Sequence, residues 1–209
     1  MIRGSLAKMP FVAILRGITP DEVVAIGRAL TGAGITIIEV PLNSPQPFES
    51  IARLAGDLGT RCLVGAGTVM TPRDVDRVRA AGGRLIVMPH GDRIVIEAAK
   101  AAGLDCVAGV ATPTEAFAVL AAGADALKMF PGEILGAPVL KAWRAVLAKE
   151  TLLLPVGGVA TQNLAAYAAA GADGFGIGSA FYAPGMTSAE VGCEPKPWWP
   201  PARRLQCDR

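Results

Sequence analysis

Lys128 and Glu39 are ionisable residues that each interrupt a run of apolar residues. Lys128 lies in ALKMFP (126–131), and Glu39 lies in IIEVPL (37–42). An ionisable group in such a run is costly to bury unless it is paired or used in chemistry. The apolar neighbours of Lys128 disfavour the ammonium form, which predicts a larger fraction of neutral amine able to attack a carbonyl carbon. A carboxylate beside that amine could move the protons that Schiff-base chemistry requires.

Each of the two residues also has a purely structural explanation. Lys128 could be a buried lysine neutralised by a carboxylate, and Glu39 could pair with Arg16 or with Lys128 in a structural ion pair. Together, however, the amine and the carboxylate form a constellation suited to Schiff-base catalysis.

Other polar residues near the ends of strand-like segments could contact a substrate. The planar guanidinium of Arg16 suits a carboxylate, and Thr68 could add a hydroxyl donor to the same group, although threonine is also an ordinary strand former. Asn43 and Ser44 could contact substrate hydroxyls or serve only the turn before a proline. The single histidine, His90, is expected to be an exposed loop residue outside the catalytic set.

Eight short β-rich segments and the alanine-rich helical stretches between them predict a parallel α/β fold. The strands are expected at 11–16, 37–42, 63–69, 85–89, 106–110, 126–130, 152–156 and 174–178, with helices at 21–33, 73–81, 113–122 and 162–170 among others. Ala-Gly ends five of the helical stretches shortly before a strand, where glycine suits a left-handed C-cap. Eight such units in about 180 residues predict a compact (β/α)8 TIM barrel with its active site at the C-terminal ends of the strands. A doubly wound open sheet is the alternative, but no switch point is visible.

Two glycine-rich segments, VGGV (156–159) and GIGS (176–179), end the seventh and eighth predicted strands. In a barrel these two loops are the usual position of a phosphate, because backbone N–H groups can approach an anion where no side chain intervenes. Gly158, Gly178 and Ser179 are therefore candidate phosphate-binding residues. Glycine is also common in such turns for steric reasons alone.

The composition limits the classes of partner. The chain has 209 residues, 52% of them hydrophobic, and a net charge of +2, which gives no broad electrostatic surface for nucleic acid or anionic lipid. No apolar stretch approaches the roughly 20 residues of a membrane span, and residues 1–10 lack the apolar core of a signal peptide, so a cytoplasmic location is expected. The four cysteines have no CxxC spacing. No metal site and no cofactor is expected.

Several motifs together resemble the 2-keto-3-deoxy-6-phosphogluconate aldolase family from about Pro10 to Gly185. The matching stretches are AILRGITPDE (13–22), IIEVPLNSPQP (37–47), GAGTV (65–69), ATPTEAF (111–117), ALKMFP (126–131), VGGV (156–159) and GIGS (176–179). The resemblance implies that Lys128 is the Schiff-base lysine and Glu39 the general acid/base. It also implies that the remaining candidates contact the substrate, with Arg16 and Thr68 at its acid end and Gly158, Gly178 and Ser179 near its phosphate. A homotrimer is likewise implied by the resemblance.

One local difference bears on the substrate. Gluconate-type members resemble EVTLR after the catalytic glutamate, whereas this chain reads EVPLN, so that Asn43 takes the place of an arginine. The change moves the carboxylate-binding duty toward Arg16 and predicts cleavage of the phosphorylated galactonate epimer of the keto-deoxy sugar acid. The alternatives are the gluconate epimer, a phosphate-binding barrel of another class such as a thiamine phosphate synthase or an isomerase, and a sugar-phosphate-binding regulator.

The last residues depart from the family pattern. Residues 1–191 are expected to form the barrel, and residues 192–209 an irregular tail, because Pro195, Pro197, Pro200 and Pro201 exclude a regular helix. The closing helix of the barrel is therefore in doubt at this stage.

Overall fold

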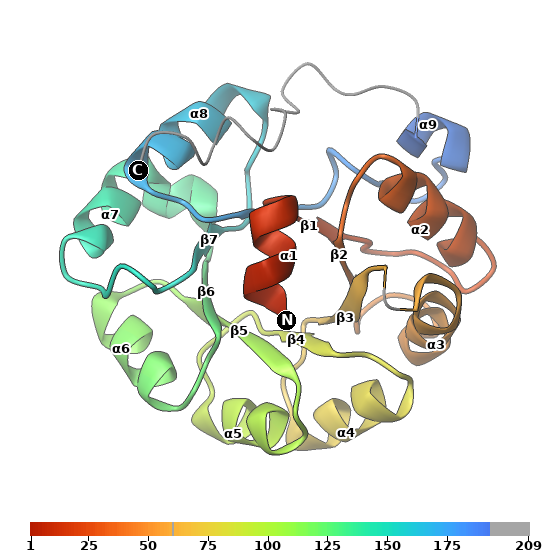
Figure 1. Ribbon diagram of the computed structural model, residues 1–209, viewed down its shortest axis with the longest axis horizontal. Helices are drawn as coiled ribbons and strands as arrows, with labels where there is room; N and C mark the ends of the chain where they lie inside the picture. Colours follow the sequence, from red (N-terminus) through yellow and green to blue (C-terminus); the bar gives the residue numbers. More distant parts are fainter. Residues whose placement is uncertain (60, 193–209) are drawn as a thin grey trace.

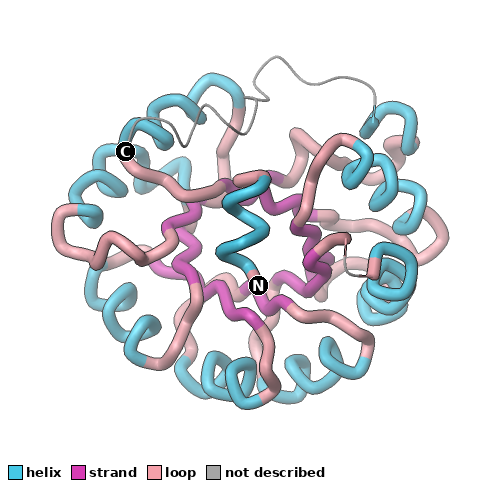
Figure 2. Tube along the Cα trace, in the orientation of Figure 1, coloured by secondary structure: helices cyan, strands magenta, loops and turns pink. Residues whose placement is uncertain are grey.

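The computed structural model describes residues 1–59 and 61–192, and its centre is an eight-stranded parallel barrel. The strand order is β7-β6-β5-β4-β3-β2-β1-β8, and a parallel bridge between Val156 and Gly176 links the two ends of the sheet (Figures 1 and 2). The strands are β1 (Phe11–Ile14), β2 (Ile37–Pro41), β3 (Leu63–Gly67), β4 (Leu85–Val87), β5 (Asp105–Val110), β6 (Ala126–Met129), β7 (Leu153–Pro155) and β8 (Phe175–Ile177). The predicted (β/α)8 barrel is confirmed, and the open sheet is wrong.

Helices form the outer layer of the barrel, as Figure 2 shows. They are α2 (Val23–Gly32), α3 (Pro47–Leu58), α4 (Pro72–Ala80), α5 (Arg93–Ala101), α6 (Pro113–Ala121), α7 (Gly132–Arg144), α8 (Thr161–Ala170) and the short α9 (Ser188–Gly192). The five Ala-Gly sequences do mark helix ends, because each glycine has the positive φ that a left-handed cap requires, from +74° at Gly103 to +101° at Gly171. α9 packs against α2 on the outside of the barrel. Apart from Gly192, the predicted tail at 192–209 lies outside the described residues.

Strand alternation sorts the apolar side chains into two clusters. Ile38 and Val40 of β2 pack outward against the helices, whereas Ile37 belongs to a second cluster inside the barrel. Successive residues of a strand point to opposite faces, so Glu39 faces inward above Ile37. By the same rule Lys128 faces inward above Ala126 on β6, because Leu127 and Met129 pack outward.

A helix that the sequence analysis did not anticipate, α1 (Ile2–Lys8), closes the N-terminal end of the barrel. It lies across the middle of the ring of strands in Figure 1, and its Ile2 and Leu6 join the interior cluster. The spacing of these two residues is one helical turn, which puts both on the face turned to the strands.

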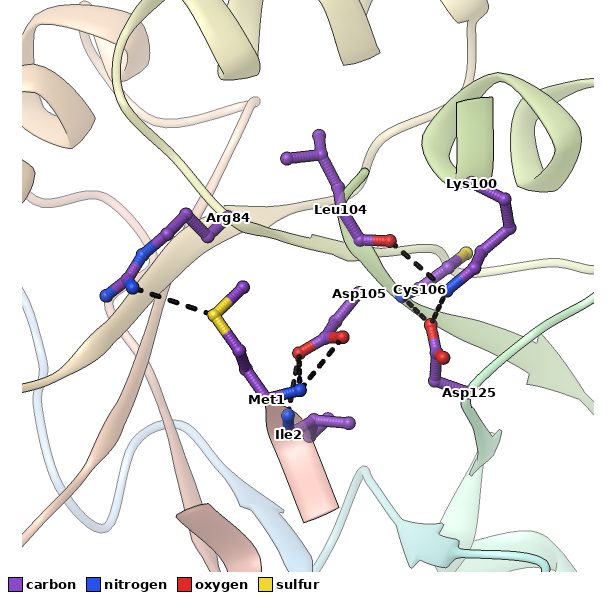
Figure 3. A network of polar contacts seen from close by, with 8 residues as sticks. All are labelled: Met1, Ile2, Arg84, Lys100, Leu104, Asp105, Cys106 and Asp125. Atoms are coloured by element: carbon purple, nitrogen blue, oxygen red, sulfur yellow. Dashed lines mark hydrogen bonds and ion pairs between the residues drawn. The ribbon is translucent and has the colours of Figure 1, made fainter. Parts of the chain in front are cut away.

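Asp105, at the start of β5, anchors this helix (Figure 3). Its Oδ2 accepts a hydrogen bond from the Ile2 N–H at 2.6 Å, and its Oδ1 lies 3.3 Å from the Met1 amino nitrogen. Beside it, Asp125 accepts the Cys106 N–H at 2.8 Å and pairs with Lys100 at 2.6 Å. Carboxylates thus satisfy the backbone donors where α1 and β5 begin.

Replacing Asp105 with alanine should destabilise the protein without changing its chemistry. The Ile2 N–H would lose its buried acceptor, which should lower the free energy of unfolding by about 1–3 kcal/mol in urea denaturation. Asp105→Asn is the matched control, because the amide keeps an acceptor oxygen. Equal stability of the alanine variant and the parent would show that Asp105 does not anchor α1.

Candidate active site

Lys128 and Glu39 are the only lysine and glutamate that the structure buries inside the barrel among its described residues. Their exposed fractions are 7% and 3%. Glu39 lies on β2 and Lys128 on β6, so the two approach the barrel interior from different sides. The sequence pattern therefore placed both groups correctly within apolar strands.

Burial shifts both groups toward their neutral forms. It raises the pKa of Glu39 to about 7, although the positive charges of Lys128 and Arg16 act in the opposite direction. Burial also lowers the pKa of Lys128, an effect that the Glu39 carboxylate opposes and Arg16 reinforces. An amine whose pKa is lowered and a carboxyl that titrates near neutrality therefore share the barrel interior.

Two neighbours of this pair were not recognised as site residues from the sequence. The Nζ of Lys128 lies 4.5 Å from the ring centroid of Phe130, close enough for a cation–π contact when the nitrogen is charged. Gly67 at the end of β3 lies against Glu39, and a Cβ built on Gly67 would overlap the Glu39 carboxylate. Phe130 lies two residues after Lys128, which is the spacing of one strand face and could have revealed it. Nothing local in GAGTV pairs Gly67 with a residue on β2.

The Oε2 atom of Glu39 is buried and has no hydrogen-bond partner within the part of the chain that the structure describes. Buried carboxylate oxygens are normally hydrogen-bonded, and a catalytic role is one of the recognised reasons for a buried oxygen without a partner. This oxygen is therefore free to accept a proton from a bound molecule.

Thr68 has a backbone conformation that the sequence did not predict. It was expected late in a strand, but β3 ends at Gly67, and Thr68 has φ of +57° in the left-handed region. A β-branched residue is an outlier there, and such strain is found mainly where it orients a functional side chain. Thr68 directly follows the glycine that contacts Glu39.

Arg16 lies just beyond β1 and not within it, because that strand ends at Ile14. Its Nη1 donates to the Oδ1 of Asn43 at 2.6 Å, and the adjacent Gly17 N–H donates to the Oγ of Ser44 at 2.9 Å. Asn43 and Ser44 therefore hold the loop after β1 against the loop after β2. His90, in contrast, is exposed and its ring makes no hydrogen bond to any described residue.

The two glycine-rich loops lie side by side after β7 and β8. Gly157 and Gly158 have φ of +95° and +63°, and side chains at either position would overlap Glu133. The bridge between Val156 and Gly176 brings this loop next to Gly178 and Ser179. Both loops open at the end of the barrel that holds Arg16 and Thr68.

The described residues also bear on metal binding and on membrane insertion. These residues contain no group of three or more His, Cys, Asp or Glu side chains placed to hold a metal ion. None of the helices described is both long enough and apolar enough to cross a bilayer.

Comparison with known proteins shows a match over nearly the whole chain. The family profile described as KDPG and KHG aldolase matches residues 2–190. A probable 2-dehydro-3-deoxy-6-phosphogalactonate aldolase of Rhizobium meliloti (strain 1021) is 47% identical over 182 residues, which are 87% of this chain and 86% of the relative. The 2-dehydro-3-deoxy-6-phosphogalactonate aldolase of Escherichia coli (strain K12) is 45% identical, covering 86% and 88% of the two chains. A solved structure described as native KDPGal superposes with a TM-score of 0.90 at 42% identity, covering 94% and 95%.

Thr68→Gly should make the protein more stable and less active. Glycine adopts a positive φ without a Cβ clash, so the free energy of unfolding should rise by about 1 kcal/mol, while loss of the hydroxyl should lower kcat/KM about tenfold or more. Thr68→Ser, which keeps the hydroxyl, should retain most of the activity. Urea denaturation and steady-state kinetics on the same preparations check both effects, and a less stable glycine variant would contradict the strain.

Proposed function

Because the chain belongs to the KDPG and KHG aldolase family, we propose that it is a class I aldolase that cleaves 2-dehydro-3-deoxy-6-phosphogalactonate to pyruvate and D-glyceraldehyde 3-phosphate. The observation that carries the reaction is the buried Lys128 amine in the same barrel interior as the Glu39 carboxyl, whose Oε2 has no hydrogen-bond partner among the described residues. The two relatives that bear the galactonate name carry the choice of substrate.

Lys128 supplies the nucleophile. Its lowered pKa increases the fraction of neutral amine, whose nitrogen forms a bond to the C2 keto carbon of the substrate. Glu39 transfers protons so that the former carbonyl oxygen leaves as water, and the product is an iminium that can accept an electron pair. The Phe130 ring faces the same nitrogen and favours its positive charge in the iminium.

Glu39 then takes the proton of the C4 hydroxyl. The C3–C4 bond breaks, the C4 oxygen becomes the aldehyde of glyceraldehyde 3-phosphate, and the bonding electron pair moves into the iminium to give an enamine. Protonation of the enamine at C3 and hydrolysis by water release pyruvate and restore the Lys128 amine. A carboxyl with a pKa of about 7 can give and take protons at neutral pH, which these successive steps require. The steps need no redox change and no group from outside the chain except water.

The ends of the substrate would be bound by different loops. Arg16, held by Asn43, and Thr68 would bind the substrate carboxylate near Lys128. Gly158, Gly178 and Ser179 would bind the phosphate through the loops after β7 and β8. This distribution would hold the reacting carbons between two anion sites and over the amine.

The proposal includes a homotrimer in the cytoplasm. Ile94 on α5 and Phe117 on α6 expose 66% and 51% of their surface, and association of subunits is one way such apolar residues become covered. A cytoplasmic location agrees with a substrate whose phosphate and carboxylate charges oppose passage through a bilayer.

Pyruvate with borohydride should inactivate the enzyme by reducing a Schiff base on Lys128. Peptide mass spectrometry should find the stable adduct on Lys128 and not on Lys141, an exposed lysine of α7 that serves as an internal control. A thiamine phosphate synthase or a sugar-phosphate-binding regulator would form no adduct. An adduct on Lys141 or Lys149, or none at all, would refute the mechanism.

Glu39→Gln should remove proton transfer while preserving shape. In the parent enzyme kcat/KM should fall as the pH drops below about 7, because Glu39 becomes protonated and cannot accept the hydroxyl proton. The glutamine variant should lose this inflection and about 100-fold or more in turnover. Near-normal turnover with an unchanged pH profile would show that Glu39 serves only as an ion-pair partner.

The two epimers of the substrate distinguish the proposed activity from its nearest rival. The galactonate epimer should be cleaved with the higher kcat/KM, since Asn43 stands where gluconate-type members have arginine and both named relatives are galactonate enzymes. Purified enzyme with each epimer, and pyruvate release as the readout, gives the comparison. A clear preference for the gluconate epimer would reassign the substrate within the family.

A further inference from the structure

Two carbonyl groups of the loop after β7 accept hydrogen bonds from helices in the outer layer of the barrel. The Gly157 carbonyl accepts the backbone N–H of Glu133 at 3.1 Å, at the start of α7. The Gly158 carbonyl accepts the side-chain Nδ2 of Asn163 at 2.8 Å, in the first turn of α8. Both carbonyls thus point into the outer layer of the barrel.

The direction of each carbonyl fixes the direction of the next N–H, because the trans peptide unit is planar and its N–H points opposite to its C=O. The N–H of Gly158 therefore points away from α7, and the N–H of Val159 points away from Asn163. Neither N–H has a hydrogen-bond partner among the described residues. Two successive free amides next to residues of positive φ form a concave anion-binding surface.

Asn163 is suited to this contact through both ends of its amide. Its Oδ1 accepts the Ala160 N–H at 3.0 Å, and its Nδ2 donates to the Gly158 carbonyl. The two partners fix the orientation of the amide, since the opposite assignment would place oxygen against oxygen and N–H against N–H. One side chain thereby caps α8 and orients the Gly158–Val159 peptide.

The loop after β8 reaches a similar arrangement without a side chain. The Gly178 carbonyl accepts the N–H groups of Phe181 and Tyr182 at 2.8 and 3.0 Å, so the Ser179 N–H is turned the other way by the backbone of its own turn. The Gly158–Val159 peptide has no such turn and depends on Asn163. Loss of that hydrogen bond would allow the peptide to rotate and present a carbonyl where the other loop presents an N–H.

We propose that Asn163 is a positioning residue for the substrate's phosphate, which orients the Gly158–Val159 peptide so that its N–H group faces the anion. The proposal rests on the proposed function, in which this loop binds the phosphate. It goes beyond that function because Asn163 itself would not touch the substrate. It predicts a defect confined to the phosphate end, since Lys128 and Glu39 lie on β6 and β2.

Two substitutions separate the roles of the amide. Asn163→Ala removes both hydrogen bonds and adds no charge. Asn163→Asp keeps an acceptor for the Ala160 N–H, and hence the cap of α8, but replaces the donor to Gly158 with an oxygen. Thr112→Ala is the matched control, because Thr112 caps α6 through the Glu115 N–H and lies in another loop.

The experiment tests the phosphate end, the Lys128 end and the folding of the parent and all variants. KM and kcat with the phosphorylated substrate, and competitive inhibition by inorganic phosphate, report the phosphate end. The rate of pyruvate trapping by borohydride reports the Lys128 end, and the thermal midpoint reports folding. Both Asn163 variants should show KM and the phosphate inhibition constant raised about tenfold or more, because a hydrogen bond to a charged acceptor contributes at least that much, with the trapping rate unchanged. Thr112→Ala should lose stability only.

The outcomes are distinguishable from failure of the proposed function. A parent enzyme that forms no pyruvate adduct and cleaves neither epimer overturns the proposed function itself. An active parent whose two Asn163 variants keep normal KM overturns the positioning role, as does a rise in KM for Asn163→Asp alone, which would mean simple charge repulsion. Loss of pyruvate trapping in step with the rise in KM would also overturn it, because Asn163 would then be a general structural residue. If Asn163→Ala does not fold, the capped Asn163→Asp variant decides, with the ionic-strength dependence of its KM separating charge repulsion from lost orientation.

Discussion

A lysine and a glutamate share the apolar interior of this barrel, and the free-energy cost of taking their charges out of water shapes the structure around them. Burial favours the neutral form of both groups, while each charge stabilises the other, so the pKa of Glu39 is raised to about 7 and the pKa of Lys128 is lowered. The barrel accommodates the pair because Gly67 leaves the volume that the Glu39 carboxylate occupies. A residue with a side chain at that position would displace the carboxylate that the proposed mechanism requires.

The barrel has an apolar end and a polar end along its axis. Below Glu39 and Lys128 an apolar cluster fills the barrel, and Ile2 and Leu6 of α1 belong to it. Above them the loops carry the charged and polar groups. Because Asp105 anchors α1 at the closed end, stability and chemistry depend on groups at opposite ends of the strands. This separation lets the open end hold a strained residue such as Thr68, whose backbone the closed, well-packed half must support.

Hydrogen bonds between neighbouring loops give the open end its shape. Arg16 and Gly17 are held by Asn43 and Ser44, so the loops after β1 and β2 act as one unit. The loop after β7 is held by the starts of α7 and α8, with Asn163 making the contact that no backbone group provides. The groups of the proposed anion sites are thus oriented by residues that would not contact the anion. A site preformed in this way does not have to reorganise when its ligand binds.

The sequence by itself determined the barrel, because each βα unit is encoded locally. Apolar strands and stretches of helical periodicity alternate along the chain, and Ala-Gly ends five of the helical stretches. It also indicated that Lys128 and Glu39 lie within apolar strands, whereas the structure showed that both face inward, because apolar residues flank them on both faces of each strand. Tertiary structure alone decided what those groups meet. Gly67, which lies against Glu39, belongs to a different strand. Thr68 has a left-handed backbone because the chain turns after β3. Asn163 donates to the carbonyl of Gly158, five residues earlier in the chain. α1 was not predicted for a similar reason. Seven residues are too few for a helix to be stable alone, and α1 is stabilised by the packing of Ile2 and Leu6 against the N-terminal end of the barrel.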